Sequence, residues 1–172
     1  MGASAVYPGS FDPPTLGHVS LVERGLAVFD KIIVAVARNP EKGALFTVDE
    51  RVGLLKESLG GFPEGRIEID LFEGLTVEYA RSRGAGAILR GLRATSDFEY
   101  EFRMAMMNRH LEKGIQSVFL MADHQWFYIS SSTVKEAASL GADISDLVPE
   151  PVARRLRGKF PARRLAQGPA SR

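Results

Sequence analysis

The sequence contains no cysteine, which excludes disulfides, thiolate metal sites and a cysteine nucleophile. No apolar run approaches the 18 or so residues of a membrane-spanning helix. The first residues, MGASAVYPG, lack the basic segment and long apolar run of a signal peptide. These absences argue against a membrane protein or a disulfide scaffold, and they make the cytoplasm the expected location.

What the chain does contain is typical of one folded domain. Its 172 residues are 45% hydrophobic and 25% charged, with a net charge of +1. The charge is uneven, because seven Lys and Arg and no acid follow residue 150, which leaves 15 basic against 21 acidic side chains before it. We therefore expect a domain over residues 1–160 and a flexible basic tail over 161–172. An acidic body also argues against a nucleic-acid partner.

Five short runs are typical of β-strands: SAVYP (4–8), KIIVAVA (31–37), RIEIDLF (66–72), AILRG (87–91) and SVFLM (117–121). Several are continuously apolar, as in strands covered on both faces, whereas 66–72 alternates and should be more exposed on one side. Helical patterns separate the runs. The alternation predicts a three-layer α/β domain with a five-stranded parallel sheet.

Helix-start signals divide the remaining chain. We expect helices to begin near Thr15, Thr47, Thr76, Ser96, Pro151 and within SSSTVKE (130–136). The first should run to about Phe29, with Thr15 as N-cap and His18 in its first turn. Thr47 with Glu50 and Ser96 with Glu99 have the spacing of capping boxes, and the helix from Ser96 should run to Lys113.

The carboxyl ends of parallel strands are where such sheets bind ligands. Four of the five connections at this edge carry groups that can bind anions: Ser10 and His18; Arg38 and Lys42; Arg90 and Arg93; Ser130, Ser131 and Ser132. Lys and Arg supply full charge, and helix N-termini supply unpaired N–H groups. The edge therefore predicts a polyphosphate site, although it contains neither a P-loop nor a G-x-G-x-x-G motif.

Each of these positions also has an ordinary structural interpretation. A lone histidine in a first helical turn can be a surface residue, the arginines can pair with nearby glutamates, and three serines can serve only as a cap. Their convergence on one edge favours the phosphate site. His110 and His124 do not share spacing with His18, so we expect no protein-built metal site. The Phe102, Met104, Met106 and Met107 side chains are interpreted as core or subunit contact, with pocket lining as a further option.

Two segments resemble the signatures of the nucleotidyltransferase superfamily: GSFDPPTLGH, which matches T/H-x-G-H, and ISSS. Over about residues 4–160 the chain resembles bacterial phosphopantetheine adenylyltransferases, through YPGSFDP, NPEK with LFTVDERV, ILRGLRATSDFEYE, MNRHL and ISSSTVKE. Ser10 stands where the family commonly has threonine, which keeps the hydroxyl, and the segment ADHQW lacks a proline often found there.

The resemblance implies a Rossmann-like domain, assembled as a homohexamer, that makes dephospho-coenzyme A and pyrophosphate from ATP and 4′-phosphopantetheine with Mg²⁺. It places ATP on Ser10, Phe11, His18, Gly91, Leu92, Arg93, Glu101, Trp126, Phe127, Tyr128, Ile129, Ser130, Ser131 and Ser132. It places the acceptor phosphate on Ser10, Lys42 and Arg90, and the pantetheine arm near Leu75, Thr76, Met107 and Asn108. His18, Lys42 and Arg90 are the expected catalytic residues.

A phosphate monoester is largely ionised at neutral pH, so the attacking group needs no general base. Catalysis then depends on alignment and on donors aimed at the α-phosphate, which makes His18 a transition-state donor instead of a base or nucleophile. Two alternatives stay open at this point. One is a related transferase acting on nicotinamide mononucleotide or a cytidylyl substrate, and the other is a non-catalytic nucleotide-binding module.

Overall fold

The computed structural model describes residues 2–38, 43–93 and 95–161, and the expected tail over 161–172 lies almost entirely outside these ranges. The sheet has five parallel strands: β1 (Ser4–Gly9), β2 (Lys31–Ala37), β3 (Ile67–Phe72), β4 (Ala87–Leu92) and β5 (Gln116–Met121). Their order is β3-β2-β1-β4-β5. The predicted fold class and all five strands are confirmed, with ends that differ by at most one residue.

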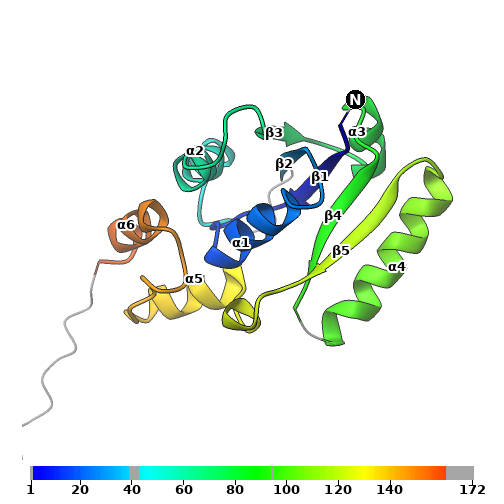
Figure 1. The fold of residues 1–172 in the computed structure, drawn as a ribbon. Coiled ribbons are helices and arrows are strands. Elements are labelled where there is room, and N and C mark those ends of the chain that lie inside the picture. The colour runs from blue at the N-terminus through cyan, green and yellow to red at the C-terminus, as the bar shows by residue number, and fades with distance from the viewer. Residues whose placement is uncertain (1, 39–42, 94, 162–172) are drawn as a thin grey trace, which may run out of the picture.

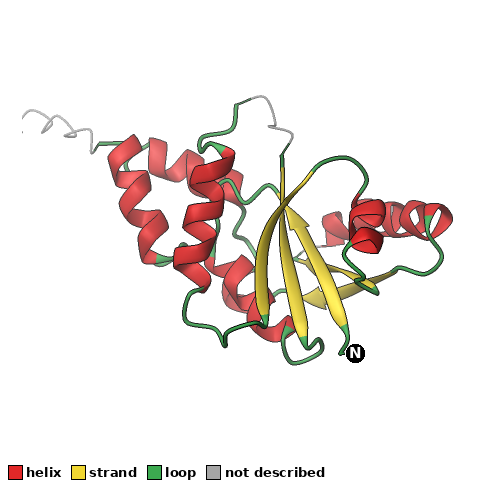
Figure 2. Cartoon of the chain, turned by 90° about the horizontal axis from the view of Figure 1, so that it is seen from above, coloured by secondary structure: helices red, strands yellow, loops and turns green. Residues whose placement is uncertain are grey.

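The sheet forms the middle layer of the domain (Figures 1 and 2). α1 (Leu16–Gly25) and α2 (Val48–Leu59) pack on one face, over a core that includes Val34 and Leu89. α3 (Thr76–Ser82) and α4 (Thr95–Leu111) cover the other, over Val6, Ile33 and Ile88. β1, β2 and the first half of β4 are therefore buried on both faces, as their sequences predict, whereas β5, at the edge of the sheet, is only half-buried.

A smaller core lies beside the sheet. α5 (Ser131–Ser139) and α6 (Glu150–Lys159) enclose it with Phe46 and Leu54, and Figure 1 shows α6 next to α2 with α5 on its other side. A 3₁₀ turn, η1 (His124–Trp126), joins β5 to α5. This second core fixes where α5 begins, at the carboxyl edge of the sheet.

Three helices in the described part of the chain begin with capping boxes, and that of α5 is formed by Ser130 and Thr133. Thr47 and Glu50 exchange hydrogen bonds at the start of α2, as predicted. Thr15 caps α1, and its capping partner is His18, an unexpected role for that residue. α1 ends at Gly25, earlier than predicted, but turn-type hydrogen bonds continue to Phe29 N–H, which bonds to the Gly25 carbonyl at 2.8 Å and brings the Phe29 ring into the core.

Three other sequence predictions were wrong in detail. α4 begins at Thr95, so Ser96 lies inside the helix instead of capping it, and it ends at Leu111 instead of Lys113. Pro151 is the second residue of α6. All six residues of β3 are half-buried, without the expected alternation, because β3 is an edge strand.

The apolar side chains of α4 are not core. Phe102, Met104, Met106 and Met107 are each 40–54% exposed, and Phe98 stacks on Phe102 at the surface with ring centroids 5.9 Å apart. The interpretation as core is wrong, while subunit contact remains a prediction. Within the described ranges, no helix combines the length and apolar character needed to cross a membrane.

Candidate active site

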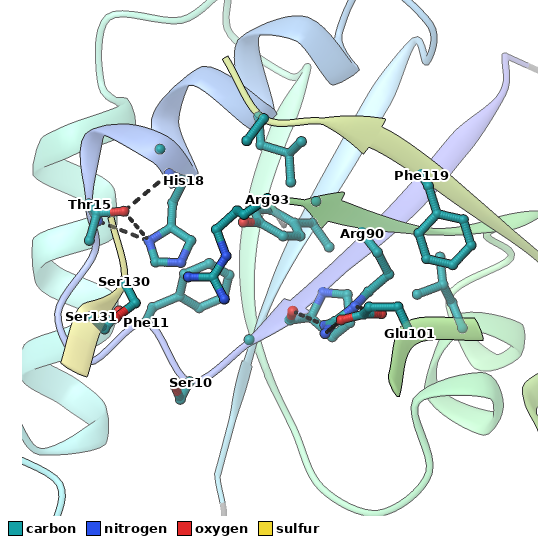
Figure 3. A pocket seen from close by; sticks show the side chains of 18 of the residues that line it. Ser10, Phe11, Thr15, His18, Arg90, Arg93, Glu101, Phe119, Ser130 and Ser131 are labelled. Carbon is teal, nitrogen blue, oxygen red and sulfur yellow. Dashed lines mark hydrogen bonds and ion pairs between the residues drawn. The ribbon is translucent and has the colours of Figure 1, made fainter. Parts of the chain in front are cut away.

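A cavity of about 670 Å³ opens where the strand order reverses, beyond the carboxyl ends of β1 and β4. This is the position at which open parallel sheets bind ligands. Its walls come from the loop after β1, the first turns of α1, β4, one face of α4, η1 and the start of α5. Figure 3 shows side chains from these elements facing one space.

The loop between β1 and α1 forms the floor. Phe11 has φ of 48°, a conformation that costs a bulky residue energy, and its ring is 1% exposed. The ring packs edge-on against Tyr7 and His18, with centroids 5.3 and 5.1 Å away. A Cβ at Gly9 would lie 2.9 Å from that ring, so Gly9 is required for the loop to close over it.

A buried arginine holds the same loop from below. Arg51 is 2% exposed and donates from Nη1 to the Ser10 carbonyl at 2.8 Å, and from Nε to the Thr47 carbonyl at 3.4 Å. The guanidinium therefore fixes the backbone of the loop and places a full positive charge under it. Sequence reasoning missed Arg51 because a charged side chain is ordinarily assigned to the solvent face, although it precedes Leu55 and Leu59 at helical spacing on α2.

The geometry around His18 selects one tautomer. Its ring Nδ1 accepts a hydrogen bond from the backbone N–H of Thr15 at 2.9 Å. The backbone N–H of His18 in turn donates to Thr15 Oγ1 at 3.4 Å. An accepting Nδ1 leaves the ring proton on Nε2. Burial, with the nearby charges of Arg93 and Arg90, lowers the pKa of His18 to about 4. His18 is thus a neutral donor at physiological pH.

The three serines before α5 have different tasks. Ser130 caps the helix by accepting from the Thr133 N–H at 3.1 Å, and Ser131 Oγ donates to the Pro13 carbonyl of the loop at 2.8 Å. Among the described residues, no partner takes up the Ser132 hydroxyl. The free N–H groups of the first helical turn and this hydroxyl therefore give the start of α5 donors that suit an anion.

Two arginines also line the cavity. Arg90, on β4, forms an ion pair with Glu101 of α4 through two nitrogens, with Nε to Oε2 at 2.9 Å, and it donates to the Pro8 carbonyl at 3.1 Å. Arg93 donates to the Ile129 carbonyl at 3.1 Å. Figure 3 shows the Arg93 side chain directed toward the His18 ring. Both guanidinium groups therefore bring positive charge to the cavity, that of Arg90 being paired with Glu101.

The structure brings most of the predicted site residues together. The cavity is lined by Ser10, Phe11, His18, Thr76, Arg90, Gly91, Arg93, Glu101, Asn108, Trp126, Ile129, Ser130, Ser131 and Ser132. Leu75, Leu92, Met107, Phe127 and Tyr128 do not line it, and Tyr128 is 88% exposed. Lys42 lies outside the described residues.

Several lining residues were missed by sequence reasoning. Arg24 follows Gly17 and Leu21 at helical spacing on α1, a pattern that could have placed it on the cavity side. Phe119 lies beside Arg90 in the strand register of β4 and β5. The register of neighbouring strands cannot be read from the sequence, so no pattern indicated that Phe119 lines the cavity.

The described residues hold no group of three His, Asp or Glu side chains that could bind a metal ion. Within those ranges, the cavity offers donors and cations, together with the paired carboxylate of Glu101, in place of a metal cage. Such a site suits phosphate groups that bring their own cation.

Comparison with known proteins agrees with this geometry. Residues 6–137 match the family model described as cytidylyltransferase-like. The phosphopantetheine adenylyltransferase of Oleidesulfovibrio alaskensis is 58% identical over 159 residues, which are 92% of each chain. Those of Geotalea daltonii and Anaeromyxobacter sp. (strain K) are 55% and 49% identical, over 91% and 93% of this chain and 96% of their own.

The chain belongs to the phosphopantetheine adenylyltransferase family. The family resemblance drawn from the sequence motifs is thereby confirmed, and the protein is a nucleotidyltransferase-type enzyme. The matched segment, residues 6–137, contains the floor of the cavity, both arginines and the start of α5. It ends before α6, which contributes to the second core but not to the cavity.

Proposed function

We propose that the protein transfers the adenylyl group of ATP to 4′-phosphopantetheine. An oxygen of the acceptor phosphate attacks the α-phosphorus of ATP and forms a new P–O bond. The bond from that phosphorus to the oxygen bridging to the β-phosphate breaks, and pyrophosphate leaves with the electron pair. The products are dephospho-coenzyme A and pyrophosphate, and the reaction belongs to coenzyme A biosynthesis.

The convergence of three phosphate-binding groups in one cavity is the observation that supports the proposal most. The Nε2 proton of His18, the N-terminal end of α5 with Arg93 beside it, and Arg90 on β4 all face the same cavity. A binding module would need one phosphate-binding site. A transfer between two phosphates needs two such sites, placed so that the attacking and leaving oxygens are in line. The names of the family members support the same substrates.

Roles follow from position. The ATP phosphates would contact His18, Arg93 and the start of α5, since these adjoin one another in the cavity. The acceptor phosphate would bind between Ser10 and Arg90, together with Lys42. The pantetheine arm would extend along Thr76 and Asn108. Leu75 and Met107, which lie off the lining, would contact only the far end of the arm.

Mg²⁺ would arrive with ATP and be held mainly by phosphate oxygens. When bound, the ion would supply charge neutralisation for the departing pyrophosphate. We also propose that the protein works in the cytoplasm as a homohexamer. The exposed apolar side chains of α4 support assembly, since Phe98, Phe102 and Met106 would be covered in a subunit contact.

The test is direct. Purified protein with ATP, 4′-phosphopantetheine and Mg²⁺ should release pyrophosphate and dephospho-coenzyme A in equal amounts, measured by a coupled pyrophosphate assay and by mass spectrometry. Omitting Mg²⁺ should reduce the rate strongly. Pyrophosphate release that does not depend on the acceptor, or the absence of an adenylylated product, would contradict the proposal.

Replacing Arg90 should separate the two substrates. We expect Arg90→Ala to weaken 4′-phosphopantetheine binding by at least about tenfold and ATP binding by less than about threefold, because a charge-assisted phosphate contact is lost. Calorimetric titration of each ligand measures this. Arg90→Ala also leaves Glu101 as an unpaired carboxylate, so the double variant with Glu101→Gln removes that repulsion. Equal losses for both ligands in both variants would mean that Arg90 does not bind the acceptor.

A further inference from the structure

Asp12 is a buried carboxylate for which the proposed chemistry has no direct use. It is 5% exposed, and it lies in the loop that forms the cavity floor. It accepts hydrogen bonds from Leu45 N–H at 2.9 Å, Phe46 N–H at 2.8 Å and Lys135 Nζ at 2.7 Å. The two N–H bonds and the lysine ammonium compensate the burial of its charge and together hold the pKa of Asp12 below its usual value against the desolvation that raises it.

Asp12 and its three partners connect three separate segments. Asp12 itself belongs to the phosphate loop after β1, and Leu45 and Phe46 lie between residues 39–42 and α2. Lys135 is on α5, one turn beyond the serines that begin it. Under the proposed function, these segments carry the floor under both phosphates, the acceptor lysine and the triphosphate grip.

Among the described residues, two side-chain contacts tie the start of α5 to the phosphate loop. One is the Lys135 to Asp12 ion pair, and the other is the hydrogen bond from Ser131 Oγ to the Pro13 carbonyl at 2.8 Å. The ion pair is the stronger of the two, because both of its members are shielded, with side-chain exposures of 25% and 6%. A second pair, Lys31 with Glu68, has the same 2.7 Å separation but is 42% and 34% exposed, at the opposite end of the sheet.

A shielded ion pair contributes little net stability, because the desolvation of its charges offsets their attraction. It does fix relative position, since a displaced partner would leave the other charge buried and uncompensated. In-line transfer depends on position to within about 1 Å, and a misplacement of that size can cost about a hundredfold in rate. The pair lies between the phosphate loop and the start of α5, so its loss is expected to lower turnover as well as stability.

We propose that Asp12 and Lys135 are positioning residues, which hold the triphosphate grip of α5 in register with the phosphate loop. The inference rests on the proposed function. Neither side chain lines the cavity. Loss of the pair lets α5 shift relative to the loop. ATP still binds to the loop and to the start of α5, but its α-phosphate is less often aligned with the attacking phosphate.

The experiment compares three variants with the wild type in steady-state assays of adenylyl transfer from ATP to 4′-phosphopantetheine. Lys135→Met keeps the aliphatic length and removes the charge, and we expect kcat to fall about 10- to 100-fold with both KM values within about threefold. Lys135→Arg restores a cation and should recover kcat to within about threefold of wild type. Lys31→Met, the matched control, should be unchanged.

Each outcome of the assays supports or overturns the positioning role. Wild-type kcat in Lys135→Met, a parallel rise in KM, or a failure of Lys135→Arg to recover the rate overturns the positioning role. If Lys135→Met does not fold, Lys135→Gln, which still offers Asp12 a donor, takes its place. Should that variant also unfold, the pair serves the fold and not the alignment. An inactive wild type would instead contradict the proposed function, so the two failures are distinguishable.

Discussion

Offered 4′-phosphopantetheine, nicotinamide mononucleotide and glycerol phosphate in separate assays with ATP, the protein is expected to prefer the first by at least about a thousandfold in kcat/KM. The expectation rests on the part of the cavity away from the ATP grip. There the wall is formed by Ala37, Phe72, Thr76, Met104 and Asn108, which are small, apolar or amide side chains.

These side chains suit a slim, flexible arm that contains amides. On α4, Glu101, Met104 and Asn108 follow one another at helical spacing on the cavity side, so an amide group and a thioether lie along the path of the arm. A site with buried polar groups rejects substrates that leave those groups unpaired, by factors that reach about 10⁴. Glycerol phosphate would leave the whole wall empty, and nicotinamide mononucleotide would bring a rigid ring into it.

The assay follows pyrophosphate release at equal acceptor concentrations, and product mass identifies which acceptor was adenylylated. Asn108→Leu provides a matched variant, since it removes the amide and keeps the size. That variant should lose part of the preference for 4′-phosphopantetheine while its rate with glycerol phosphate stays the same. Preference for either other acceptor would overturn the substrate assignment and leave adenylyl transfer intact.

The layout of the site was predictable where the sequence carries local signals. Continuously apolar runs such as KIIVAVA located the strands, and in a parallel sheet their carboxyl ends meet at one edge. From that rule alone, the sequence predicts that His18, Arg90 and Ser132 lie in one site. Helix-cap signals worked where the cap is a side-chain pair, as at Thr47, and failed at Ser96, because α4 begins one residue earlier.

What the sequence could not predict depends on contacts between distant segments. Asp12 pairs with Lys135 across 123 positions, and Arg51 reaches Ser10 across 41. Neither separation has a period that a sequence pattern could detect. The different contacts of the three serines could not be predicted either. Ser131 bonds to Pro13 because the second core places α5 beside the loop.

His18 shows how a structure refines a role inferred from a motif. The motif indicates a donor to the α-phosphate, but a histidine could act as a cation, a base or a neutral donor. The Thr15 N–H bond to Nδ1 and the pKa of about 4 leave the neutral form with its proton on Nε2. NMR titration of His18 in the free enzyme should therefore show no change between pH 5.5 and 7.5, with protonation only as the pH falls toward 4.

His18→Ala should lower kcat by at least about a hundredfold, the scale of losing one donor to a developing negative charge, while ATP binding changes little. The substitution also removes the acceptor for the Thr15 N–H, so a slow variant could reflect a loosened loop.

His18→Asn separates the two causes. The Asn side-chain oxygen can take the place of Nδ1 and keep the Thr15 bond, but nothing replaces Nε2. If the lost donor is the cause, His18→Asn is as slow as His18→Ala. If the loop is the cause, His18→Asn turns over nearly as fast as wild type, and the donor role is wrong. His110→Ala, on the exposed end of α4, is the matched histidine control and should leave the rate unchanged.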